Sequence, residues 1–197
     1  MSAVILDDLP AAELRFHFKG GRACLDLVAT VGERWRRSFE RLREPGDLAR
    51  WLVEAGLLEE RPAVSGAQLT EARALREAIY RVAKRAGRGR PDPGDVREIN
   101  RWAARPDLAP QLDAGGRGVS SVADPPVESA LATLARDAID LVTGPYATRV
   151  RECGADDCAL LFVDTSRPGR RRWCSMKGCG NKVKTAAYRR RRREETP

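Results

Sequence analysis

Apolar residues recur at helical spacing over much of the chain, and the longest regular run lies between Pro125 and Gly144. Its members are three or four residues apart, so they share one face of a helix. They are Val127, Ala130, Leu131, Leu134, Ala135, Ala138, Leu141 and Val142. The pattern predicts a helix that follows an Asp124-Pro125 cap, ends at Gly144-Pro145 and supplies the centre of the core.

A helix is also predicted near the N-terminus, beginning at Gly21. Its apolar face would comprise Cys24, Leu27, Val28, Val31 and Trp35, which follow the same spacing. This face places Cys24 in the core, where a free thiol behaves as a small apolar group.

Three further helices are predicted between these two, at 47–55, 66–86 and 93–104. Ser65 and Gln68 form a capping box for the second of them. Asp92 and Pro93 suit the N-cap and first position of the third. A hairpin is expected where Gly-rich sequence separates 108–112 from 119–122.

Near the C-terminus the pattern changes to short elements around four cysteines. Residues 160–163 and 170–173 are expected to form a hairpin about the turn at Arg167-Pro168-Gly169, and a helix is expected from Gly180 to Arg193. The predicted fold is therefore mainly α, with a helical domain at 1–146 and a small α+β module at 147–197. The short connection favours two packed units over two tethered ones.

The four cysteines of this module are spaced as metal ligands. Cys153 and Cys158 form one C-x4-C pair, and Cys174 and Cys179 form the other. Two such pairs at the ends of a small hairpin can surround one tetrahedral zinc ion, as in treble-clef or ribbon-type fingers. Four thiolates complete the zinc coordination, so the sequence predicts one structural Zn²⁺ rather than a catalytic ion.

Two disulfides, an iron–sulfur cluster and a metal-free module are the alternatives to zinc. The N-terminal sequence lacks the features of a signal peptide, so a cytoplasmic location is expected, where reduced thiols are the rule. The usual iron–sulfur spacings differ from these. No apolar run is long enough for a membrane span.

Charge is concentrated in the same module. The chain has a formal net charge of +8, and residues 167–197 hold twelve Arg or Lys against two Glu, so the remainder is slightly acidic. A basic module on a nearly neutral body is typical of a polyanion-binding protein. The candidate nucleic-acid contacts are Arg167, Arg170, Arg171, Arg172, Lys177, Asn181, Lys182, Lys184, Arg189 and Arg190.

Duplex DNA is favoured over RNA as the partner. Proteins that read RNA stack bases on exposed aromatic side chains, and the module offers only Phe162, Trp173 and Tyr188. RNA binding and a zinc-stabilised protein-interaction module remain alternatives. With a single histidine, His17, and no recognisable set of catalytic groups, an enzyme is not expected.

Several segments resemble a known family. Cys153, Cys158, Trp173-Cys174-Ser175-Met176 and Cys179-Gly180-Asn181-Lys182 resemble the CGNR zinc finger, which follows a helical ABATE domain in bacterial proteins. Gly20–Asp26, Asp47–Leu52 and Leu75–Ala78 are similar to segments of that domain. The resemblance implies a DNA-binding regulator of transcription in bacteria.

Two positions depart from the family pattern. Lys182 replaces the last Arg of the motif, and Ala29 stands where Asn is common before Thr30. Lysine keeps the charge but lacks the planar two-pronged donor of arginine. The resemblance also suggests a ligand pocket near Cys24, Asp26 and Thr30. With such a pocket, the helical domain would be a sensor for a small-molecule effector. The alternative role for this domain is to form a homodimer.

Overall fold

The computed structural model describes residues 3–6, 9–112, 115–122 and 124–194. Helices dominate, and the strands are short. In chain order the elements are α1 (Ala23–Val28), β1 (Val31–Gly32), β2 (Phe39–Glu40), α2 (Pro45–Glu54), α3 (Gly66–Arg85), α4 (Pro93–Ala103), β3 (Ala109–Leu112), β4 (Val119–Val122), α5 (Pro126–Thr143), a 3-10 turn (Ala147–Arg149), β5 (Val150–Glu152), β6 (Leu161–Val163), a π-helical turn (Met176–Gly180) and α6 (Asn181–Glu194).

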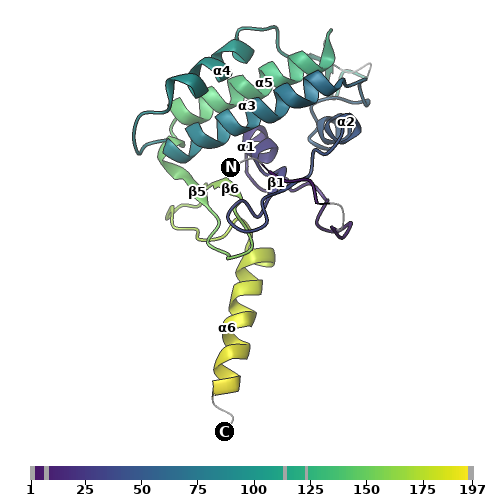
Figure 1. The fold of residues 1–197 in the computed structure, drawn as a ribbon. Coiled ribbons are helices and arrows are strands. Elements are labelled where there is room, and N and C mark those ends of the chain that lie inside the picture. The colour runs from purple at the N-terminus through teal and green to yellow at the C-terminus, as the bar shows by residue number, and fades with distance from the viewer. Residues whose placement is uncertain (1–2, 7–8, 113–114, 123, 195–197) are drawn as a thin grey trace.

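The core lies where α3, α4 and α5 pack side by side, with α1 against their inner face (Figure 1). The predicted stripe on α5 is confirmed: seven of its eight members are buried, and Val142 is half-buried. Trp51 of α2 and Trp102 of α4 are fully buried in the same core. The predicted mainly helical class is therefore correct.

Three helices have an N-terminal cap predicted from the sequence, and the structure confirms two of these caps. The Ser65 hydroxyl accepts the Gln68 N–H and the Gln68 side chain accepts the Ser65 N–H, which is the expected capping box of α3. Asp92 caps α4 by accepting the Gly94 N–H at 2.7 Å. The predicted Asp124-Pro125 cap of α5 is wrong in detail, because Pro125 itself is the N-cap and no side chain supplies a capping bond.

The predicted helix from Gly21 to Trp35 is too long, because α1 ends at Val28. The Thr30 hydroxyl donates to the Leu27 carbonyl at 2.7 Å, and the chain then turns into β1. Glu33 and Ser38 adopt left-handed backbone angles, with φ of 42° and 47°. These angles reverse the chain between β1 and β2, and Trp35 lies on the loop with 61% of its surface exposed rather than in the core.

The predicted hairpin at 109–122 is confirmed by the pairing of β3 with β4, but the second predicted hairpin is wrong. β6 pairs with β5, which precedes the first cysteine pair, and no strand forms at 170–173. The reason is Asp164, a fully buried carboxylate that accepts the Ser166 and Arg171 backbone N–H groups at 3.0 and 2.8 Å. These bonds hold the chain after β6 in a turn, so it cannot return along the strand.

The C-terminal module is packed onto the helical body, as the short connection predicts. Val150, Leu161 and Val163 of its strands belong to the main hydrophobic core. The Val163 N–H donates to the Gly20 carbonyl at 2.9 Å. The division of the chain between 146 and 147 stays a prediction, but the two parts share one apolar interior.

A buried ion pair ties α3 to the short β1–β2 sheet. Arg76 donates to both carboxylate oxygens of Glu40, at 2.7 and 2.8 Å, and the two side chains are 3% and 4% exposed. Burial acts to lower the pKa of Arg76, but the bonds to Glu40 outweigh it and the pKa is raised. Each charge therefore depends on the other for its place in the interior.

Replacing Glu40 with Gln should lower the free energy of unfolding by about 3 kcal/mol, because Arg76 keeps its charge, loses its buried carboxylate and retains only the partly exposed Glu77 as an ionic partner. Denaturant unfolding followed by circular dichroism measures this. Glu71→Gln is the matched control, since Glu71 pairs with Arg101 at 3.4 Å at the surface. The control should cost less than about 1 kcal/mol. Equal losses in both variants would contradict a structural role for the buried pair.

Candidate metal centre and basic surface

Four cysteine side chains meet at one point of the C-terminal module. The sulfur atoms of Cys153, Cys158, Cys174 and Cys179 all lie within 4.8 Å of one another. Cys153 follows β5, Cys158 lies in the loop before β6, Cys174 follows the Asp164 turn and Cys179 lies in the π-helical turn. The structure therefore brings together all four predicted metal ligands.

The backbone shapes two loops that aim the sulfur atoms inward. The Cys153 N–H donates to the Leu160 carbonyl at 2.9 Å, which extends the β5–β6 ladder by one bond. The Cys158 N–H donates to the Ala155 carbonyl at 3.0 Å and closes the turn between the first two cysteines. Around the second pair, the Ser175 hydroxyl accepts the Gly178 N–H at 3.2 Å.

Gly180 leaves room for the Met176 side chain in the second loop. A Cβ atom at Gly180 would lie 2.9 Å from the sulfur of Met176, so the flexible end of the Met176 side chain would have to shift. The Gly180 N–H also donates to the Ser175 carbonyl at 2.9 Å, which fixes the start of α6 beside the last cysteine. The loop thus couples the metal-ligand geometry to the direction of the helix.

The sulfur atoms are not joined as disulfides. Cys158 and Cys174 are 4.0 Å apart and Cys174 and Cys179 are 3.7 Å apart, whereas a disulfide needs about 2.05 Å. Hydrogen bonding with Cys153 raises the pKa of Cys158 to about 12, and it likewise raises the pKa of Cys174. Four thiolates can share this space only when a cation neutralises them, so the donor set fits a thiophilic metal ion.

A small apolar cluster surrounds the four sulfur atoms. Its buried members are Ala29, Cys153, Ala155, Leu160, Phe162 and Cys174, with Cys158, Trp173, Cys179 and Val183 partly buried against them. Ala29 comes from the helical body, and Val183 is the one residue of α6 in the cluster. At the candidate metal centre, residues of the helical body, the C-terminal module and α6 therefore pack against one another.

Arg171 is part of the module's own packing. Its guanidinium donates to the Cys174 carbonyl at 2.7 Å and lies 4.9 Å from the centre of the Phe162 ring. The side chain is half-buried, whereas its neighbours Arg170 and Arg172 are exposed. Arg171, one of the predicted nucleic-acid contacts, thus already forms contacts within the finger, next to a metal ligand.

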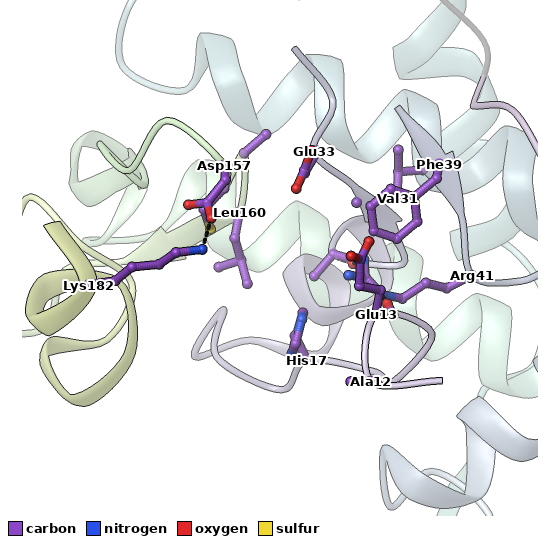
Figure 2. A pocket seen from close by; sticks show the side chains of 14 residues that line it. Ala12, Glu13, His17, Val31, Glu33, Phe39, Arg41, Asp157, Leu160 and Lys182 are labelled. Carbon is purple, nitrogen blue, oxygen red and sulfur yellow. Dashed lines mark hydrogen bonds and ion pairs between the residues drawn. The ribbon is translucent and has the colours of Figure 1, made fainter. Parts of the chain in front are cut away.

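Lys182 is engaged as well. Its ammonium group forms an ion pair with Asp157 of the first cysteine loop (Figure 2). This pair links the start of α6 to the opposite side of the metal centre. Attraction to Asp157 raises the pKa of Lys182. No sequence pattern predicts this pair, because Asp157 lies 25 residues from Lys182, in a loop.

The other predicted contacts lie at the surface. Those exposed to solvent are Arg167, Arg170, Arg172, Lys177, Asn181, Lys184, Arg189 and Arg190. α6 extends away from the rest of the molecule after its first turn (Figure 1). Within the described residues, none of these Arg and Lys side chains has a carboxylate within ion-pair distance. A basic surface thus runs from the Asp164 turn along α6.

A family model for ABATE, described as "Putative stress-induced transcription regulator", matches residues 21–145. The chain belongs to the ABATE family. A second model, the CGNR zinc finger, matches residues 149–192 and follows in the order that the resemblance predicts. A search of curated proteins returns no match. No helix among the described residues is long and apolar enough to cross a membrane.

The suggested ligand residues of the ABATE domain serve packing in the structure. The Cys24 side chain is buried, and its N–H donates to Asp137 at 2.8 Å. Thr30 bonds Leu27 and Arg76 and is also buried. Asp26 accepts the Gly20 N–H at 2.8 Å, and burial raises the pKa of Asp26 to about 6. None of the three lines the cavities described in this structure.

Replacing Cys174 with Ser should release the metal from the CGNR finger and unfold it, because ligand bonds supply much of the stability of a module this small. Metal content by mass spectrometry and amide hydrogen exchange in residues 150–194 measure both effects. Cys24→Ser is the control, since Cys24 lies in the ABATE core away from the finger. Full metal content in the Cys174 variant would reject the assignment of this ligand.

Arg171→Ala should speed removal of the metal by a chelator several-fold, because the finger loses a bond to the Cys174 carbonyl and packing on Phe162. Arg170→Ala is the matched control and should leave the rate unchanged, since Arg170 is exposed. A colorimetric chelator assay follows release. Equal rates in the two variants would show that Arg171 does not support the centre.

Proposed function

We propose that the protein is a bacterial DNA-binding regulator of transcription in which a zinc-held module presents α6 to the major groove. The observation that supports this proposal is α6 itself, a basic helix that extends from the metal centre with only its first turn packed against the protein. The ABATE description and the CGNR match support a regulatory role. In this proposal the ABATE domain is the candidate sensor and homodimer module.

Zinc is the ion that best suits the four sulfur atoms. It takes four thiolates in a tetrahedral arrangement and has no redox chemistry of its own, so the resulting site is structural. The four cysteines Cys153, Cys158, Cys174 and Cys179 would be its ligands, in a module that we assign to the treble-clef type. Because the ligands complete the coordination, no position remains for a water molecule to be activated.

The dimensions of α6 suit duplex DNA. Its 14 residues give a rod of about 21 Å, and the major groove is about 12 Å wide, enough for one helix. Arg189, Arg190, Arg191 and Arg192 are consecutive and exposed, so they point to different sides of the rod. Such an arrangement can reach phosphates on both walls of the groove.

Binding of a polyanion would also reduce the electrostatic repulsion within α6. Like charges in neighbouring turns of α6 repel one another, and no carboxylate pairs with Lys184, Arg189 or Arg190 among the described residues. Phosphate groups would neutralise these charges and release counterions to solvent, which makes the binding salt-dependent. The exposed arginines of the Asp164 turn, Arg167 and Arg170, would contact the adjacent backbone.

Stacking surfaces for single-stranded nucleic acid are scarce in the described part of the finger. Phe162 is 1% exposed, and Trp173 is half-buried in the cluster around the sulfur atoms. Tyr188 is exposed, but Arg192 lies over its ring at 6.0 Å. Since RNA readers depend on exposed rings, duplex DNA is the partner that this surface favours.

The triple change Lys184→Ala, Arg189→Ala and Arg190→Ala should weaken DNA binding and flatten its salt dependence. With about six phosphate contacts the slope of log K against log salt is about −5, and three lost contacts reduce its magnitude by about 3. Fluorescence anisotropy with labelled duplex DNA over a series of salt concentrations measures both quantities.

The matched control removes three arginines from the ABATE domain, Arg61, Arg88 and Arg90, which are all exposed. This variant has the same net charge as the α6 variant and should keep the native slope. Equal effects in the two variants would mean that net charge alone governs binding. Preference for single-stranded RNA of equal length, or no binding in dilute buffer, would overturn the DNA assignment.

A further inference from the structure

A cavity of about 240 Å³ lies between the ABATE domain and the CGNR finger. His17, Glu13 and Arg41 face it from the body, and Asp157, Leu160 and Lys182 face it from the finger (Figure 2). Its volume is below the range of about 300–1,000 Å³ that is usual for drug-sized ligands. The space suits a molecule of amino-acid size that would contact both parts of the chain.

Arg41 is a buried cation at this cavity without a carboxylate partner among the described residues. The residue is 5% exposed. Nε donates to the Glu13 carbonyl at 2.8 Å, Nη1 donates to the Ala29 carbonyl at 3.0 Å, and the guanidinium lies 4.7 Å from the centre of the Phe39 ring. Nη2 has no acceptor within the described structure.

This arrangement prepares Arg41 for a carboxylate. Two carbonyl bonds and an aromatic ring fix the plane of the guanidinium and leave Nη2 without an acceptor in the described structure, so Nη2 can donate to a carboxylate oxygen. Burial lowers the pKa of Arg41 to about 10, so the group stays charged at neutral pH. Glu13, Glu33 and Glu40 attract this buried charge from beyond ion-pair distance, and a bound carboxylate would give it a direct partner.

The carboxylates around the cavity already have cations of their own. Glu13 and Glu33 both pair with Arg37, and Asp157 pairs with Lys182. A carboxylate can accept further hydrogen bonds, so these groups can also receive an ammonium group. Their combined negative charge disfavours a ligand with two negative charges.

His17 adds no cation to the site. Burial, together with nearby Arg41 and Lys19, lowers the pKa of His17 to about 4, so the imidazole is neutral at pH 7. Val31, Phe39 and Leu160 supply apolar surface between the charged groups. The cavity therefore offers one position for a carboxylate, several acceptors for an ammonium group and apolar walls for a short side chain.

We propose that this cavity binds a free amino acid or a zwitterion of that size, with its carboxylate on Arg41 and its ammonium group facing Glu33 and Asp157. Lys182 lies in the first turn of α6, and its partner is Asp157. An ammonium group that engages Asp157 frees Lys182 for a phosphate. This second step, a rise in DNA affinity on ligand binding, rests on the proposed function, whereas ligand binding itself does not.

The test measures the melting temperature of the full chain, without DNA, against each of the twenty proteinogenic L-amino acids. For leucine and valine, the deaminated analogues isocaproate and isovalerate and the decarboxylated analogues isoamylamine and isobutylamine are included, and equivalent analogues are added for any other hit. At ten times its Kd, a ligand should raise the melting temperature by roughly 3–6 °C. The analogues, which lack one charge, should raise it less.

Two variants locate the ligand. Ala29→Leu fills the cavity without removing any side-chain hydrogen bond, and Arg41→Gln removes the carboxylate donor. Because Ala29 also packs in the cluster around the sulfur atoms, the metal content of Ala29→Leu is measured and must equal that of the native chain. Isothermal titration with the best amino acid should show at least tenfold weaker binding to each. Ala63→Leu, an exposed change of the same size, is the control and should bind as the native chain does.

Three results would overturn the proposal: no amino acid shifts the melting temperature, the analogues bind as tightly as the amino acid, or Ala29→Leu binds like the native chain. DNA affinity is then measured with and without the best amino acid. Ligand binding without any DNA binding would reject the proposed function and leave the site standing. DNA binding without ligand binding would reject the site alone.

Discussion

The convergence of four cysteine sulfur atoms within 4.8 Å is the constraint on which the C-terminal module depends. Four thiolates repel one another, so this arrangement fits a site whose ligands would surround a cation. Even with a divalent ion the cluster keeps a negative charge, and the chain places cations around it. Arg171 donates to the Cys174 carbonyl, and Lys182 pairs with Asp157 beside the first loop. The ligands therefore organise the arginine and lysine side chains as well as the backbone.

The same module is held to the ABATE domain by contacts of two kinds. Val150, Leu161 and Val163 share the main apolar core, which fixes β5 and β6 against the helices. At the edge, Glu152 accepts the Trp35 indole N–H and pairs with Lys84 of α3 at 3.2 Å. Because α6 begins at the metal centre, its direction is set relative to the whole body. A conformational change in the body can thus reach the helix.

Elements with a periodic or motif-like signal could be predicted from the sequence, and those set by single contacts in loops could not. The periodic stripe of α5, the Ser65 capping box and the cysteine spacing each act within a few residues or a fixed geometry. The failures depend on individual loop contacts that follow no periodic pattern. Asp164 redirects the chain by capturing the Arg171 N–H, and Trp35 leaves the core because the backbone reverses after Thr30.

The role of a charged residue is also hard to predict from the sequence alone, because arginine occurs in both parts of the chain. In the ABATE domain several arginines are neutralised by partners far away in sequence: Arg22 pairs with Asp137, Arg34 with Glu77 and Arg76 with Glu40. In the finger, Arg167 and Arg170 have no such partner within the described residues. The number of cations therefore does not locate a polyanion site. Arginines without a carboxylate partner also occur singly in the body, as at Arg61 and Arg88 among the described residues. What distinguishes the finger is that such cations follow one another from the Asp164 turn along α6, with no carboxylate paired to Arg167, Arg170, Lys184, Arg189 or Arg190 in the described part of the chain.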